Sequence, residues 1–163
     1  MKKKRKLFIR PSISDVLFRC EESPKSIQIF KEIHVDGGAF VSPPTYKFHD
    51  AYFSVLSNEN ELIHFEKNIG DVWSGVAEYE AIKWAVENIT ERPLKIYSDC
   101  TVAISWARKG ANTKKFHLPK LHLQGIEIEY KHDNFADRWN AANHSPKKDK
   151  KFYIERYYAS KSK

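Results

Sequence analysis

Four acidic residues occupy places in the chain where a carboxylate could bind a divalent metal ion. Asp36 interrupts the apolar, β-prone run Ile33–Phe40 and is followed by two glycines. A charge in a buried strand is costly unless something pairs with it. Three further acids lie near the ends of expected elements: Glu78, Asp99 and Asp137. Carboxylates without His or Cys are typical of Mg²⁺ or Mn²⁺ sites and not of Zn²⁺ sites.

Three of these carboxylates also have ordinary structural explanations. Asp99 would cap the helix that begins after it, and Glu78 or Asp137 would complement a helix dipole. Asp36 has no such alternative, because a mid-strand Asp beside two glycines has no helix to cap. The case for a metal site therefore depends on all four positions together.

The segment Gly75–Ile89 has the clearest helical pattern in the chain. Counting from Glu78, apolar residues follow at i+4, i+7 and i+11 and form one row. This row predicts that Glu78 lies in the first turn and faces inward. Glu80 instead shares a side with Lys83 and Glu87, which we expect to face solvent. The pattern favours Glu78 over Glu80 as a site residue.

The elements that must position these acids follow the order β-β-β-α-β-α-β-α. Strands are expected from about residue 27 to 36 and over 51–56, 61–66, 94–98 and 126–130, with a loop over 41–45. Helices are expected over 75–89, 102–107 and 135–139, the last with Asn134 as its N-cap. Strand–helix–strand crossovers imply parallel neighbours, so the sheet is mixed. If the first and fourth strands are neighbours, Asp36 and Asp99 meet at their carboxyl ends.

Composition indicates one domain with a core of its own. The chain has 163 residues, 41% of them hydrophobic. We place the domain at 27–144, between a basic N-terminal extension, 1–26, and a Lys-rich tail, 145–163. The net charge of +7 favours a polyanionic partner, although many soluble proteins are basic without binding one. The basic run Met1–Lys6 is compatible with a nuclear address, an arm on phosphates or a solvated tail.

The cysteine and hydropathy patterns indicate in which cellular compartment we expect the protein. Cys20 and Cys100 are the only cysteines, too few for a zinc site or a secreted disulfide framework. No HExxH motif occurs, and His117 and His122 are five residues apart, which is wrong for one helical face. No long apolar run follows the basic N-terminus or reaches transmembrane length. We expect a cytoplasmic monomer without membrane contact, or a nuclear one in a eukaryotic host.

Four short motifs, taken in order, resemble the type 1 ribonuclease H family. The helix Thr101–Trp106 is also similar to that family, and the resemblance covers about residues 27–144. The four motifs are Val35–Gly38, Val76–Ala81, Ile96–Asp99 and Asn134–Asp137. The resemblance implies an RNase H-like α/β fold, with a five-stranded mixed sheet in the order 3-2-1-4-5 and helices on both faces. It implies an endonuclease that hydrolyses the RNA strand of RNA–DNA hybrids with two Mg²⁺ ions, or Mn²⁺.

The resemblance also implies roles for individual residues. Asp36, Glu78, Asp99 and Asp137 would be the catalytic metal ligands, with Asp36 bridging both ions. His132 precedes the last helix, where the family often has a mobile His or Arg that assists water positioning or product release. The alternative for His132 is an exposed loop residue without a catalytic role.

The segments that would contact substrate depart from the family. Where a Thr-Asn-Asn run often precedes the helix glutamate, this chain reads Trp73-Ser74-Gly75. The usual glycine-rich loop after the first Asp is replaced by Phe40–Pro44, and no long basic protrusion is present. The expected nucleic-acid contacts are Gly37, Gly38, Ser74, Gly75, Arg108, Lys109, Lys114 and Lys115.

These departures leave two alternatives open. The first keeps the fold and metals but acts on other structured or single-stranded nucleic acid. The second is a non-catalytic binding module, in which Trp73 and Trp139 stack on bases. A solvated loop is the competing explanation for the basic residues between 108 and 115.

Overall fold

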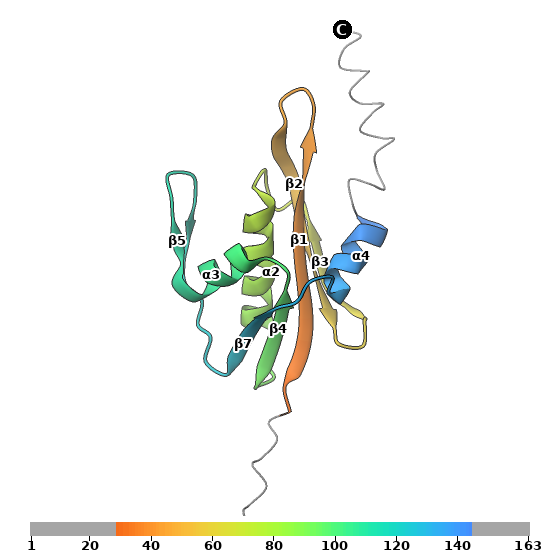
Figure 1. The fold of residues 1–163 in the computed structure, drawn as a ribbon, viewed down its shortest axis with the longest axis vertical. Coiled ribbons are helices and arrows are strands. Elements are labelled where there is room, and N and C mark those ends of the chain that lie inside the picture. The colour runs from red at the N-terminus through yellow and green to blue at the C-terminus, as the bar shows by residue number, and fades with distance from the viewer. Residues whose placement is uncertain (1–28, 145–163) are drawn as a thin grey trace, which may run out of the picture.

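Five strands form one mixed sheet within residues 29–144, the part of the chain that the computed structural model describes (Figure 1). Their spatial order is β3-β2-β1-β4-β7. The first three strands pair antiparallel, whereas β4 is parallel to β1, and β7 to β4. The strands are β1 (Lys31–Ser42), β2 (Lys47–Ser57), β3 (Leu62–Lys67), β4 (Leu94–Ser98) and β7 (Ile126–Tyr130). This confirms the order and directions of the RNase H-like fold.

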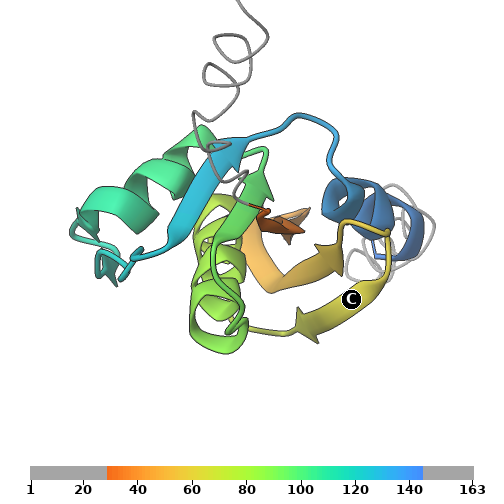
Figure 2. The same ribbon diagram turned by 90° about the horizontal axis from the view of Figure 1, so that it is seen from below.

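Three helices cover the two faces of the sheet (Figure 2). The crossover helices α2 (Ser74–Asn88) and α3 (Thr101–Lys109) lie on one face, and α4 (Phe135–Asn143) lies on the other. Alternation along β1 matches this arrangement. Val35 belongs to the core beneath α2, whereas the ring of His34 packs against the ring of Phe135 in α4, with 4.5 Å between their centroids. No helix within the described range is long and apolar enough to cross a membrane.

The core lies between the sheet and the two crossover helices. Its fully buried side chains include Ile33, Tyr79, Ile82 and Ile96. The apolar row that follows Glu78 is buried, as its spacing predicts. The predicted position of Glu78 in the first turn is wrong. Because Trp73 is the N-cap, Glu78 is the fifth helical residue and lies in the second turn.

Two hairpins differ from the expectations. The predicted loop at 41–45 is wrong at its start, because Val41 and Ser42 continue β1 and pair with Phe48 and Lys47. The Pro43–Tyr46 turn closes this longer hairpin. The basic connection after α3 contains a second, two-stranded sheet, β5 (Ala111–Asn112) with β6 (His117–Leu118), which the sequence pattern did not predict. The expectations for residues 1–26 and 145–163 lie outside the described residues.

Candidate metal centre

The register of two parallel strands brings Asp36 beside Asp99. In the β1–β4 pair Ile33 lies opposite Ile96, and His34 lies opposite Tyr97. The same offset, continued for two residues, sets Asp36 level with Asp99. Because β4 ends at Ser98, Asp99 lies just past the carboxyl end of its strand. In open α/β sheets, ligands bind at this edge, outside the carboxyl ends of the parallel strands.

Gly37 allows helix α2 to approach β1 closely. A Cβ atom at this position would lie 2.4 Å from the backbone carbon of Ala77 and from the backbone nitrogen of Glu78. Backbone atoms cannot give way cheaply, so only glycine fits. A Cβ at Gly38 would lie 2.5 Å from the Tyr52 hydroxyl. Both glycines therefore have a packing role, and Gly37 sets the distance between Asp36 and Glu78.

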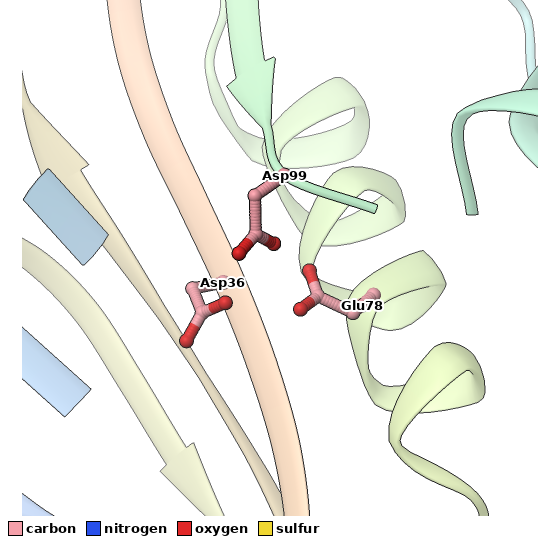
Figure 3. A group of neighbouring side chains, drawn as sticks. All are labelled: Asp36, Glu78 and Asp99. Carbon is pink, nitrogen blue, oxygen red and sulfur yellow. The ribbon is translucent and has the colours of Figure 1, made fainter. Parts of the chain in front are cut away.

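Three carboxylates converge at this point (Figure 3). Asp36 from β1, Glu78 from α2 and Asp99 from the end of β4 each offer an oxygen, and these oxygens lie within 4.8 Å of one another. Asp36 and Glu78 are each 7% exposed, and Asp99 is half-buried. Three of the four predicted ligands therefore form one group.

Burial makes ionisation of this group costly. It raises the pKa of Asp36 to about 7, an effect that the nearby Asp99 and Asp137 charges increase. Burial, followed by the charge of Asp36, also raises the pKa of Glu78 well above its ordinary value. Oε2 of Glu78 is buried without a hydrogen-bond partner. A divalent cation fits this set, because it would supply the missing partner and offset the clustered negative charge.

Asp137 lies close to this group but outside it. It occupies the first turn of α4, where its backbone N–H donates to Oδ1 of the N-cap Asn134 at 3.0 Å. Burial and then the charge of Asp99 raise its pKa. Its carboxylate is not among the oxygens that lie within 4.8 Å of one another. His132 is exposed, and a proton on its ring would lower the pKa of Asp137.

Two asparagines attach α4 to the strand that carries Asp36. Nδ2 of Asn134 donates to the carbonyl of Val35 at 3.2 Å. Nδ2 of Asn140 donates to the Asp36 carboxylate at 2.6 Å and to its carbonyl at 3.3 Å. The prediction of Asn134 as N-cap is confirmed, whereas the role of Asn140 was not predicted from the sequence. Its spacing, three residues after Asp137 on the same helical side, was the available signal.

His34 is a second residue whose role the sequence pattern did not predict. It is fully buried, and its Nε2 lies 3.1 Å from the side-chain oxygen of Asn58. Its Nδ1 accepts the backbone N–H of Phe135 at 3.4 Å. Burial lowers the pKa of His34, which favours the neutral ring that this acceptor role requires. His34 thus supports the start of α4, and with it Asp137.

The remaining predicted nucleic-acid contacts lie around α3 and the start of α2. Ser74 and Gly75 are in the first turn of α2, and Gly75 is buried beside the ring of Trp73. Arg108 is exposed, but one of its nitrogens donates to the carbonyl of Ile128 at 2.7 Å. The three lysines of the set are exposed on α3 and on the β5–β6 hairpin: Lys109, Lys114 and Lys115.

No family model and no curated protein sequence matches the chain. Among solved structures, an LC11 RNase H1 in complex with an RNA/DNA hybrid is 17% identical, with 66% of this chain and 88% of that chain covered and a TM-score of 0.43. The PFV RNase H domain is 18% identical, with 66% and 90% covered and a TM-score of 0.43. A foamy viral protease-reverse transcriptase in complex with an RNA/DNA hybrid is 17% identical, with 69% and 18% covered and a TM-score of 0.47. In strand order and strand direction, the described residues are similar to RNase H-like proteins.

Proposed function

We propose that this chain is a metal-dependent endoribonuclease that hydrolyses the RNA strand of RNA–DNA hybrids. The observation that carries the proposal is the convergence of the Asp36, Glu78 and Asp99 carboxylates at the edge of the parallel strands. Three acids from three elements repel one another unless a cation offsets their charge. Their all-oxygen donor set suits Mg²⁺ or Mn²⁺. The choice of a hybrid substrate rests on the four ordered sequence motifs.

Each site residue has a role in this proposal. Asp36, Glu78 and Asp99 hold the metal, and Asp137 joins them from α4. Bound divalent ions would lower the pKa of an attacking water and stabilise the leaving oxygen. The amide of Asn140 holds one carboxylate oxygen of Asp36 at 2.6 Å, which leaves the other oxygen for the metal. We assign water positioning or product release to His132, because it is exposed next to Asp137.

A cleavage assay tests this proposal. The protein is incubated with Mg²⁺ and a hybrid labelled on its RNA strand, and products are resolved by length. Wild type should cut internal RNA positions, and Asp36→Asn should not cut. Glu59→Gln removes an exposed carboxylate in the β2–β3 turn and should retain activity. A wild type that leaves the hybrid intact, or an active Asp36→Asn variant, would contradict the proposal.

A second candidate function is cleavage of other nucleic acids at the same centre. It is favoured by Trp73, which occupies the N-cap of α2 without a side-chain capping bond and replaces the family's polar contacts. A panel of hybrid, duplex RNA, duplex DNA and single strands separates the two functions. Equal cutting of duplex DNA would favour the second one. Calorimetry that detects no Mg²⁺ binding would instead favour a non-catalytic module.

A further inference from the structure

A groove of about 1160 Å³ opens between the β1–β2 hairpin and the β5–β6 hairpin. One wall is formed by the β1–β2 hairpin, from Ser42 to Asp50, and the other by Lys115 and Phe116 of the β5–β6 hairpin. The rest of its lining comes from Asp71–Trp73 and Val76 at the start of α2. Figure 1 shows both hairpins projecting in the same direction. None of the acids of the metal centre lines this groove.

The groove exposes three aromatic side chains. Tyr46 is 69% exposed, Trp73 is 42% exposed and Phe48 is 38% exposed. The rings of Trp73 and Trp106 pack edge-on, with 5.5 Å between their centroids. The ring of Phe116 packs against the ring of Trp106, with 5.1 Å between their centroids. Because these contacts hold the half-exposed ring of Trp73 in place, a base can stack on it without a prior rearrangement. Aromatic faces in a groove are the usual platform for unpaired bases.

Each wall of the groove carries one lysine that can contact a phosphate backbone, and the lining also contains two acids. Lys47 and Lys115 are exposed, one on each wall. The two acids of the lining both make hydrogen bonds within the protein. The Asp50 carboxylate lies 2.8 Å from Nδ1 of His49, and the Asp71 carboxylate accepts the backbone N–H of Asp50 at 3.3 Å. Cations on the walls and aromatic rings between them are the two components of a single-strand binding site.

Two elements, β1 and α2, contribute residues both to the groove and to the metal centre. Ser42 lies six residues beyond Asp36 in β1, a distance of roughly 20 Å in an extended strand. Trp73 is the N-cap of the helix that carries Glu78. At about 3.4 Å per nucleotide of a helical strand, this distance corresponds to roughly six nucleotides. In a duplex the base faces are covered by stacking on the neighbouring base pairs, so the exposed rings favour an unpaired strand.

We infer that this groove binds an unpaired nucleic-acid strand that continues from the duplex held at the metal centre. The inference rests on the proposed function and narrows its substrate to hybrids that carry a single-stranded extension. Stacking uses base faces, which RNA and DNA share, so a DNA extension serves as the probe.

Binding is measured by fluorescence anisotropy in the Asp36→Asn background, with Mg²⁺ present, so that cleavage does not interfere. The probes are a blunt RNA–DNA hybrid and the same hybrid with a single-stranded DNA extension of about ten nucleotides. The extension should lower Kd by about fivefold or more. Trp73→Ala should remove this gain, and Lys47→Gln with Lys115→Gln should reduce it.

Tyr46→Ala is a second variant, because its highly exposed ring contributes little to packing, and it should also reduce the gain. Leu62→Ala is the control, since it removes an exposed apolar side chain on β3, outside the groove. Equal Kd values for the blunt and extended hybrids would overturn the inference. So would a gain that survives in both Trp73→Ala and Tyr46→Ala. Cleavage of the blunt hybrid by wild type tests the proposed function separately, so either result can fail alone.

Discussion

Asp36 is the residue on which the site depends. It accepts a hydrogen bond from Asn140 of α4, and one of its carboxylate oxygens lies within 4.8 Å of a carboxylate oxygen of Glu78 from α2. It therefore links the helices on both faces of the sheet. Burial raises the pKa of the Asp36 carboxyl to about 7, so without metal this carboxyl holds a proton near neutral pH. A cation would favour the ionised form and release that proton.

The metal-free protein should lose stability as pH rises toward and through 7. Because the folded-state pKa of Asp36 is raised from 3.8 to about 7, its contribution is fully present below pH 3.8 and is lost as pH rises through 7. At about 1.4 kcal/mol per pKa unit, this loss is on the order of 4 kcal/mol for Asp36. The raised pKa of Glu78 acts in the same direction.

Thermal unfolding with a chelator, between about pH 5 and about pH 8, measures this dependence. Asp36→Asn should show a flatter pH profile and should be more stable than wild type at the upper end. Added Mg²⁺ should stabilise wild type most where the carboxylates are ionised. Stability of metal-free wild type that rises over this pH range would contradict the assignment.

Asn140→Ala should weaken metal binding and activity about 10-fold to 100-fold. The substitution removes the amide that orients one oxygen of Asp36 at 2.6 Å. Asn143→Ala is the matched control, because Asn143 lies on the same helix and its exposed side chain donates to the carbonyl of Trp139. Mg²⁺ affinity by calorimetry is the measurement. Equal affinities in the two variants would show that Asn140 does not position Asp36.

At the scale of elements, the packing of α2 against β1 determines the geometry of the site. Gly37 faces the backbone of α2 so closely that any side chain would push the helix away. Two residues earlier in β1, Val35 and the core beneath α2 hold the same pair of elements together. The distance from Asp36 to Glu78 therefore depends on the absence of a side chain at Gly37.

Gly37→Ala should therefore impair metal binding as well as stability. Its Cβ would lie 2.4 Å from backbone atoms of α2, and such overpacking costs about 1–3 kcal/mol. Ile89→Val, just past the far end of α2, should cost about 0.5–1.5 kcal/mol and leave the Kd for Mg²⁺ unchanged. Chemical denaturation and calorimetry measure the two effects. A Gly37→Ala variant with the metal affinity of wild type would contradict this role.

For the whole molecule, the distribution of charge differs between residues 29–144 and the two ends of the sequence. Residues 29–144 contain 13 Lys and Arg but 16 Asp and Glu, a net charge of −3, although the whole chain has +7. The excess of positive charge lies entirely in residues 1–28 and 145–163. The net positive charge from which a polyanionic partner was inferred therefore comes from these two segments and not from residues 29–144.

Affinity for a hybrid should accordingly depend on the terminal lysines. Replacing four of them with Gln should weaken binding and lower its salt dependence, by about 0.9 in the log–log slope for each phosphate that is no longer neutralised. The four are Lys147, Lys148, Lys150 and Lys151. The control replaces an equal number of lysines within residues 29–144: Lys31, Lys67, Lys83 and Lys120. Kd is measured over a series of salt concentrations, and equal slopes in both variants would contradict the prediction.

Local pattern was sufficient for much of the fold. The predicted bounds of β4 match the structure, the apolar row that follows Glu78 in α2 is buried, and Asn134 caps α4. These features depend on residues within a few positions of one another, which periodicity and capping chemistry describe well. The hairpin extension of β1 escaped prediction, because the two prolines after Ser42 suggested a loop. The short β5–β6 pair has too few residues to show a periodicity.

The sequence by itself determined the order of the elements and the four acids that they carry. Tertiary structure decided which of those acids meet: Asp36, Glu78 and Asp99 form one group, and Asp137 lies beside it. It also revealed Asn140 as the partner of Asp36 and Gly37 as the point of closest approach to α2. These relations join residues far apart in the chain, through strand register and helix docking. Local residue preferences carry no information about such pairings, because their energy arises only when the sheet and helices pack together.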